Sequence, residues 1–205
     1  MNPSVLFQLS YGLYVLTAKG GKDNGCIINT AMQITASPNR LLIAVNKDNL
    51  THDIISYTKQ FNLSILSQDC SFDTFKHFGY QSGKNVDKFA NYENCQRSEN
   101  GLLYLPRETN GYISGKVTNI IDSGTHSLFI ADVTAGEVLS EVPSVTYDFY
   151  QKSIKPAPSQ GDAKSDSGKK RYRCRICDYI YEGESLPDDF ICPICKHGVV
   201  DFEEI

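Results

Sequence analysis

The chain lacks three features that would place it in a common functional class. None of its apolar runs approaches the roughly 18 residues needed to cross a bilayer, and no secretory signal precedes the first residues, so we expect a cytoplasmic protein without membrane contact. It has no Gly-x-Gly-x-x-Gly fingerprint, so no dinucleotide-binding turn can be identified by motif. Its net charge of −4 offers no general attraction for nucleic acid.

Cysteine, in contrast, is well represented and carries the strongest chemical signal. Cys174 and Cys177 form one Cys-x-x-Cys pair, and Cys192 and Cys195 form a second after 14 intervening residues. Two such pairs can direct four thiolates at one tetrahedral metal, and an all-sulfur site suits zinc or iron. Zinc would make the segment structural, whereas iron would carry single electrons. The remaining cysteines have no metal-binding spacing, and we expect them to be ordinary reduced residues: Cys26, Cys70 and Cys95.

The residues around the cysteine pairs resemble rubredoxin over residues 171–205. The resemblance rests on Tyr179-Ile-Tyr181 and on Leu186-Pro-Asp-Asp-Phe190, which leads into the second pair. Asp178 stands where that family usually has glycine, and the loop between the pairs is shorter than in a free-standing rubredoxin. The resemblance favours one iron, with zinc as the alternative. Eight acidic against four basic residues in this segment argue against a DNA-binding zinc ribbon.

Only 35 residues follow Lys170, fewer than the roughly 40 at which a domain usually needs a metal or disulfides to fold. We therefore expect the metal to supply much of the folding free energy. An aromatic cluster is expected beside it, formed by Tyr172, Tyr179, Tyr181, Phe190 and Phe202. The preceding residues 151–170 are rich in Pro, Gly, Ser and Lys and are predicted to be a flexible tether.

Residues 1–150 are predicted to be mainly β, forming a small closed or split barrel with short helices. Strands are expected at residues 11–17, 26–28, 40–46, 61–66, 111–121 and 127–133, the last two forming a hairpin through Asp122-Ser-Gly124. Helices are expected at about residues 49–60 and 71–79, the second with a core-facing stripe of Phe72, Phe75 and Phe78. Residues 80–110 show no clear pattern.

The order of these segments resembles the flavin reductase-like, FMN-binding split-barrel family. The resemblance is carried by residues 29–35, by Ser37-Pro-Asn39, by residues 45–52 and by residues 124–129, which read Gly-Thr-His-Ser-Leu-Phe. Together with the rubredoxin-like tail, the chain resembles more specifically the high-molecular-weight rubredoxins, which are NAD(P)H-oxidising flavoproteins with a rubredoxin domain. The expected division is therefore a barrel at 1–150, a tether at 151–170 and an iron domain at 171–205.

This resemblance implies a set of flavin-site residues. Those expected along the isoalloxazine edge are Asn29, Thr30, Ala31, Met32, Gln33 and Asn46. Those expected near the phosphate, where a strand passes into a helix, are Lys47, Asn49, Thr51 and His52, with Thr51 also capping the helix. His126 corresponds to a histidine that lies near the nicotinamide in members of this family, where it can help to position the dinucleotide. Each also has a plain structural interpretation, such as helix capping for Thr51, a surface position for His52 or a turn position for His126.

The two resemblances together imply an electron-transfer oxidoreductase that forms homodimers. NAD(P)H would reduce FMN, the flavin would pass electrons to the iron, and the iron would reduce an acceptor, by resemblance a flavodiiron-type oxygen or nitric oxide reductase. One alternative keeps the flavin reductase but makes the tail a zinc-bound docking module. Another is a non-catalytic flavin-binding sensor or partner-binding protein. The preference for NADH or NADPH, and transfer within or between subunits, are not predicted.

Overall fold

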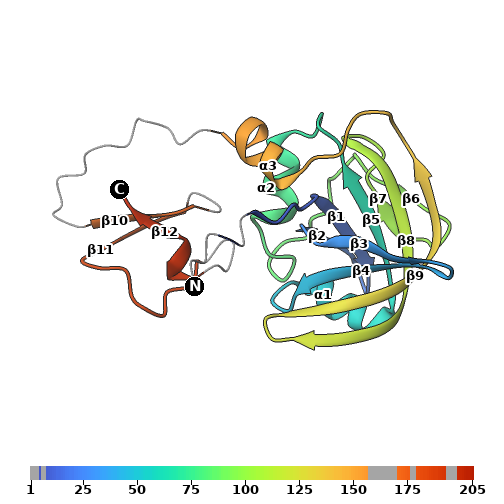
Figure 1. Ribbon diagram of the computed structural model, residues 1–205, viewed down its shortest axis with the longest axis horizontal. Coiled ribbons are helices and arrows are strands. Elements are labelled where there is room, and N and C mark those ends of the chain that lie inside the picture. Colours follow the sequence, from blue (N-terminus) through green and yellow to red (C-terminus); the bar gives the residue numbers. More distant parts are fainter. Residues whose placement is uncertain (1–4, 6–7, 157–169, 176–178, 193–197) are drawn as a thin grey trace. The chain divides into compact units, whose positions relative to one another are not determined.

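The computed structural model describes residues 5, 8–156, 170–175, 179–192 and 198–205. The chain divides into two units, Met1–Lys155 and Pro156–Ile205, and each is described here by itself (Figure 1). This division falls within the segment 151–170 that the sequence predicts as a tether, of which residues 157–169 lie outside the described residues. No helix in the described parts is long and apolar enough to span a membrane.

The first unit is built on one antiparallel sheet in the order β2-β1-β5-β8-β9-β4-β3 (Figure 1). Its strands are β1 Tyr14–Lys19, β2 Asp23–Ile28, β3 Ala31–Ala36, β4 Asn39–Asn46, β5 Gln60–Leu66, β8 Thr109–Ser123 and β9 His126–Val138. The two edge strands, β2 and β3, are consecutive in the chain and only Asn29 and Thr30 join them. Because three residue steps reach at most about 11 Å, the sheet must curl until its edges meet at this corner. The result is a split barrel, as predicted.

Alternation along the strands separates the barrel interior from its outer face. In β4, Leu41, Ile43 and Val45 are buried inside, while the intervening residues are partly exposed. The interior holds one hydrophobic cluster with Phe61 and Phe129 at 0% exposure. The outer face of β3, β4, β8 and β9 also carries apolar side chains, namely Met32, Ile34, Leu42, Ile121, Leu128 and Ile130.

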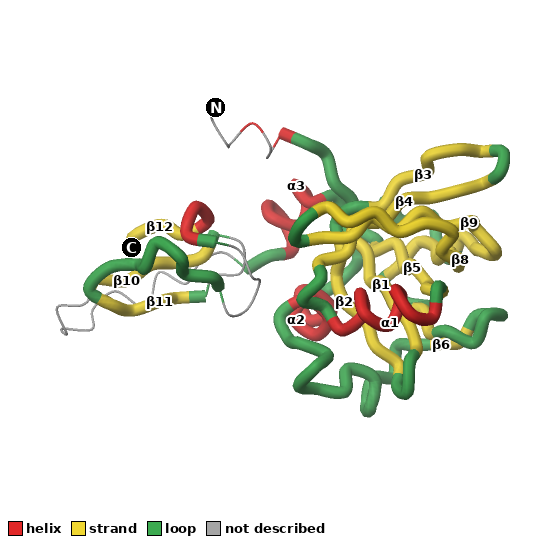
Figure 2. The backbone as a smooth tube through the Cα atoms, turned by 90° about the horizontal axis from the view of Figure 1, so that it is seen from below, coloured by secondary structure: helices red, strands yellow, loops and turns green. Residues whose placement is uncertain are grey.

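Both predicted helices are confirmed. Helix α1, Leu50–Thr58, packs against β1 and β2, and helix α2, Phe72–Gly79, packs against β2 (Figure 2). Phe75 and Phe78 are buried in a second hydrophobic cluster, with Phe72 packed against it, so the aromatic stripe belongs to a core as predicted. The proposed cap is wrong: α1 begins after Asn49, and Thr51 lies inside the helix as its second residue.

Residues 80–110, which the sequence leaves unassigned, form mainly irregular chain over the sheet. They contain the short pair β6 Gln96–Arg97 and β7 Leu103–Tyr104. The segment is anchored by the buried Asn62 of β5, whose amide donates to Ser98 Oγ and to the Leu102 carbonyl at 2.8 and 3.1 Å. A short helix α3 Tyr147–Phe149 and a π-helical turn Tyr150–Ile154 close the unit.

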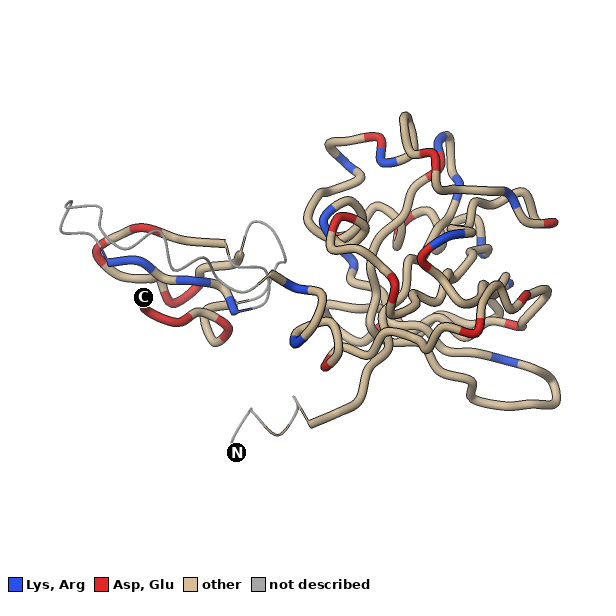
Figure 3. Tube along the Cα trace, turned by 90° about the horizontal axis from the view of Figure 1, so that it is seen from above, with Lys and Arg blue, Asp and Glu red and all other residues tan. Residues whose placement is uncertain are grey.

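The second unit is a three-stranded sheet in the order β11-β10-β12, with β10 Lys170–Cys174, β11 Ile180–Gly183 and β12 Phe202–Glu204, the last preceded by a 3-10 turn Val199–Asp201. Its basic residues gather along β10 (Figure 3) and pair with carboxylates of the same unit. The predicted aromatic cluster is confirmed, with Phe190 contacting Tyr181 and Phe202 at ring distances of 4.7 and 5.4 Å.

Candidate functional site

The first group of predicted flavin residues lies at the corner where the sheet edges meet. Asn29 and Thr30 form the turn, with the Thr30 hydroxyl donating to Asn29 Oδ1 at 3.1 Å. Ala31, Met32 and Gln33 begin β3, which pairs with β4 and with no other strand of the described residues. Met32 is 56% exposed. An exposed edge strand presents main-chain donors and acceptors to a ligand, so the position suits contact with the rim of a planar ring.

The second group lies where β4 passes into α1. Asn46 ends the strand and its Oδ1 accepts the Asp48 amide at 2.8 Å, which fixes the turn. Asn49 is the residue before the helix, and its amide donates to the Asn46 carbonyl at 3.1 Å. The turn therefore presents the N-terminus of α1, where main-chain N–H groups and the helix dipole favour an anion.

Lys47, predicted to supply positive charge to a phosphate, already has a carboxylate partner. Its ammonium lies 2.7 Å from Asp122 Oδ2 at the end of β8, and its amide donates to the Thr125 carbonyl at 3.0 Å. The Lys47 hydrogen bond is the main cause that lowers the pKa of Asp122. Lys47 thus joins the β4–α1 turn to the β8–β9 turn, and its charge is shared with Asp122.

Thr51 and His52 face inward from the first turn of α1. The Thr51 side chain is fully buried and donates to Asn24 Oδ1 at 2.8 Å. The His52 ring packs edge-on against Phe129, and its two nitrogens contact Ser127 Oγ at 2.9 Å and Asp53 Oδ1 at 3.1 Å. Both side chains therefore have protein partners, and His52 is not the solvated surface residue of the plain interpretation.

His126 begins β9 and lies directly opposite Asn46 of β4. Opposite residues of antiparallel strands point to the same face, so both lie on the outer face, while Ser127 points inward with Val45. Nδ1 of His126 contacts Thr125 Oγ1 at 2.9 Å. The structure thus brings Asn46 and His126 together and places Thr51 and His52 on the other side of the sheet.

Sequence reasoning missed Asn24, Ser127 and Asp122, each of which contacts a predicted site residue. Ser127 and Asp122 stand in segments that the sequence marks as a strand opening and a turn, but nothing there pairs them with the site. The partners of Asn24, Ser127 and Asp122 are 27, 75 and 75 positions away in the chain. Only the pairing of β2, β4, α1 and the β8–β9 hairpin in space reveals them.

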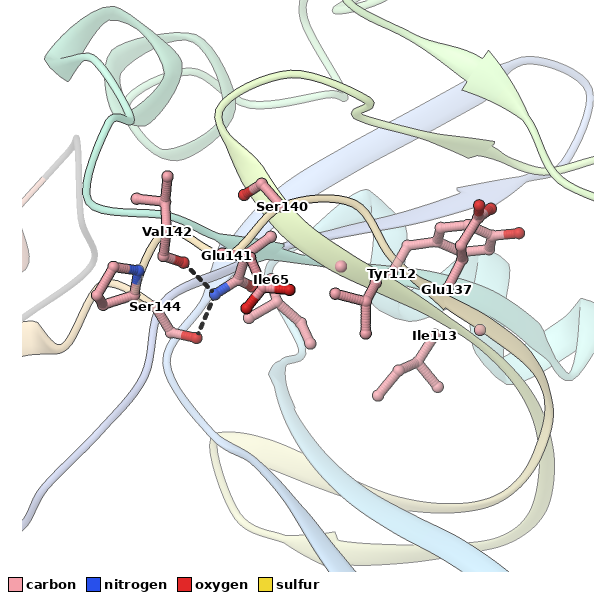
Figure 4. Close-up of a pocket in the computed structure, with 13 residues that line it drawn as sticks. Ile65, Tyr112, Ile113, Glu137, Ser140, Glu141, Val142 and Ser144 are labelled. Atoms are coloured by element: carbon pink, nitrogen blue, oxygen red, sulfur yellow. Dashed lines mark hydrogen bonds between the residues drawn. The ribbon is translucent and has the colours of Figure 1, made fainter.

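A shallow groove of about 570 Å³ lies elsewhere on the barrel unit, lined by residues that include Tyr112, Glu137 and Val142 (Figure 4). It is at the end of the β8–β9 hairpin where Gly111 pairs with Val138, whereas His126 is at the opposite end. None of its lining residues belongs to the predicted flavin set, so the groove is distinct from the candidate site.

The candidate metal centre lies in the second unit. Cys174 at the end of β10 and Cys192 are both at 0% exposure. The Cys174 amide donates to the Tyr179 carbonyl at 2.8 Å, closing the loop that contains the first cysteine pair. The other two predicted ligands, Cys177 and Cys195, lie outside the described residues. Two buried thiols from separate segments, among described residues that include no other buried apolar side chain of this unit, fit a sulfur-ligated metal.

Comparison with known proteins identifies both units. Residues 6–157 match the family described as flavin reductase like domain, and residues 172–203 match the rubrerythrin, rubredoxin-like domain. A high molecular weight rubredoxin of Moorella thermoacetica is 36% identical over 230 aligned positions, covering 100% of both chains. A ferric-chelate reductase (NAD(P)H) of Archaeoglobus fulgidus is 29% identical, covering 73% of this chain and 89% of the relative.

Among solved structures, an NADH:FAD oxidoreductase of Streptomyces globisporus in complex with NAD and FAD fragments has the same barrel. Its TM-score is 0.62 at 19% identity, covering 77% of this chain and 92% of that chain. This likeness confirms the fold. The chain therefore belongs to the flavin reductase-like family of flavoprotein oxidoreductases and carries a C-terminal rubredoxin-like domain.

Proposed function

We propose that the protein is an NAD(P)H-dependent electron carrier in which a flavin in the barrel unit reduces an iron in the rubredoxin-like unit. The observation that carries this proposal is the joint presence of both domains on one chain, in the arrangement of a relative matched over its full length. When bound, FMN accepts a hydride and releases electrons singly, and a four-sulfur iron takes up one electron at a time. The final acceptor is an external protein, proposed to be of the flavodiiron type.

The chain's own residues bind and orient the flavin. Main-chain groups of β3, with Asn46, hold the ring edge, and the turn before α1, with Asn49 and Thr51, receives the phosphate. Because the Thr51 hydroxyl is fully buried against Asn24, Thr51 contributes its main chain. Met32 and Gln33 are exposed on this edge strand, where a bound ring could contact them.

His126 is proposed to position the dinucleotide. It lies on the outer face beside Asn46, at the end of the sheet that carries the β4–α1 turn. Its ring is held by Thr125, so it presents a fixed surface to a nicotinamide. A fixed orientation lowers the entropy lost when the two reacting rings are brought together.

A second copy of the chain is proposed to cover the outer face. Met32 and Ile34 on β3 are 56% and 43% exposed, and Ile121 on β8 is 42% exposed. Contiguous exposed apolar side chains mark interaction surfaces. A homodimer through this face would bury them and would enclose the flavin edge that one copy leaves open.

The metal is proposed to be iron, bound by Cys174, Cys177, Cys192 and Cys195. The aromatic rings of the same unit support a small aromatic-shielded centre, since Phe190 contacts Tyr179 and Tyr181 and lies two residues before Cys192 in the chain. Aromatic shielding limits water at the sulfur atoms, which sets the reduction potential of such a site.

An anaerobic absorption titration tests the whole proposal. Purified protein reconstituted with FMN and iron is mixed with NADH and, separately, NADPH, and the flavin and iron bands are followed by stopped flow. Loss of the flavin band followed by loss of the iron band supports the relay. The Cys192→Ser variant should lose only the second phase, and Cys95→Ser, a barrel cysteine, should keep both. Flavin that neither donor reduces, or zinc in protein made with adequate iron, would contradict it.

A further inference from the structure

The first turn of α1 is fastened to the barrel by two side-chain hydrogen bonds from adjacent helix residues. Thr51 donates to Asn24 of β2 at 2.8 Å, and His52 contacts Ser127 of β9 at 2.9 Å. The two strand residues are each 5% exposed, and Thr51 is fully buried. Strands β2 and β9 are separated by three others in the sheet. The turn is therefore held from two sides of the barrel.

The contacts of His52 also have the spacing of a Ser-His-Asp triad, with Asp53 on the second ring nitrogen. A hydrolytic role does not follow. Ser127 is buried within β9, and its main chain pairs with Val45 on one side and Asp122 on the other. No substrate carbonyl can approach that hydroxyl, so the hydrogen bond to His52 holds two elements together.

Helix α1 depends on these bonds more than the strands do. Each strand is fixed by its ladder of main-chain hydrogen bonds, whereas the first turn of α1 has no such ladder and follows β4 after only residues 47–49. A helix N-terminus binds an anion only when its N–H groups point at one place. The two buried bonds help to set the orientation of that turn, together with the core packing of Ile55 further along the helix.

We propose that Asn24 and Ser127 are positioning residues for the flavin phosphate, acting through Thr51 and His52. Both strand residues are 5% exposed, so they would act without touching the cofactor. The proposal rests on the flavin site proposed above and predicts a specific signature: their loss weakens recognition of the phosphate and leaves recognition of the ring unchanged. Riboflavin, which has the ring and ribityl chain of FMN without the phosphate, separates the two.

The experiment measures the Kd of FMN and of riboflavin for flavin-free full-length protein by quenching of flavin fluorescence. We expect Ser127→Ala to raise the Kd of FMN about fivefold, the equivalent of one lost hydrogen bond, and to change that of riboflavin less than twofold. Ser127→Thr keeps the hydroxyl and should restore the FMN value. Ser123→Ala, an exposed residue opposite His126 in the same hairpin, is the matched control and should bind both flavins normally.

Asn24→Ala and Asn24→Asp form the second pair, because aspartate keeps the oxygen that accepts from Thr51. A selective loss of FMN affinity in the alanine variant, recovered in the aspartate variant, supports the proposal. Equal losses for FMN and riboflavin in both alanine variants would show a purely structural role and overturn it. So would a Ser127→Ala protein indistinguishable from Ser123→Ala. A wild-type protein that binds FMN no better than riboflavin would instead overturn the phosphate site itself.

Discussion

Removal of the metal should unfold the rubredoxin-like unit and leave the barrel unit folded. The structure gives the reason: among the described residues of the second unit, only Cys174, Cys192 and Asp201 are buried. Its five aromatic side chains are all partly exposed. The part of this unit that the structure describes therefore provides no buried hydrophobic core to hold it once the thiolates lose their common ligand.

The expected magnitude follows from the binding free energy of such centres. Structural zinc in zinc-finger peptides contributes about 10–16 kcal/mol at neutral pH, and we expect a similar contribution from the metal here. A whole small domain is stable by only ~5–15 kcal/mol. Chelation therefore leaves the unit without net stability. The assay is near-ultraviolet circular dichroism and proton NMR of the ring signals of Tyr179, Tyr181 and Phe190, before and after removal of the metal. Calorimetry follows the barrel transition in the same samples.

Ring signals that keep their dispersion in metal-free protein would refute this reasoning, because the aromatic cluster would then be stable alone. The Cys192→Ser variant provides the same test without a chelator and should lose the dispersed signals. Cys95→Ser in the barrel is the matched control and should keep them. A barrel transition that shifts on metal removal would show that the two units stabilise each other.

Three further predictions concern the barrel. Gly115→Ala places a methyl group 2.4 Å from the buried Phe61 ring and should cost about 1–3 kcal/mol of unfolding free energy in urea, whereas Gly21→Ala has open space and should cost little. Burial lowers the pKa of Lys88, so the unfolded state binds more protons and stability should rise with pH below the ordinary lysine value. The unfolding free energy of wild type minus that of Lys88→Met should become more positive from pH 7 to pH 10. A difference that does not change with pH would contradict a lowered pKa of Lys88. Burial raises the pKa of Cys70 to about 12, so a thiol reagent at pH 8 should modify it only after unfolding.

The barrel can be predicted from the sequence where β-branched and aromatic residues gather between turn residues. Strand β4 and the β8–β9 hairpin are predicted on this basis, with Asp122-Ser-Gly124 marking the turn. Strand β3 was not identified as a strand, since its residues are mostly exposed on an edge and show no buried face. The residue pattern that predicts a strand arises from side chains buried on one face, and an edge strand with few buried side chains shows little of that pattern.

Residues 80–110 were unassigned for a different reason. Their stability comes from side chains elsewhere, as in the bonds from Asn62 to the Leu102 and Leu103 carbonyls. Lys88 is similar: it is 3% exposed and donates to the carbonyls of Gly25 and Phe78 at 2.9 and 2.8 Å. From the sequence, a lysine in an irregular segment is expected at the surface. Its burial becomes possible only because the fold brings carbonyl acceptors from distant residues to its ammonium group.

The site shows the same limit at the level of single residues. Lys47, Thr51 and His52 were predicted to contact the phosphate because of their types and their place before a helix. In the structure each side chain has a protein partner, namely Asp122, Asn24 and Ser127. Residue type and position identify the segment that meets the ligand. A side chain can touch the ligand or hold the segment in place, and which of these it does depends on partners that only the fold brings near. Substitution of Asn24 and Ser127 therefore tests whether Thr51 and His52 hold the segment in place.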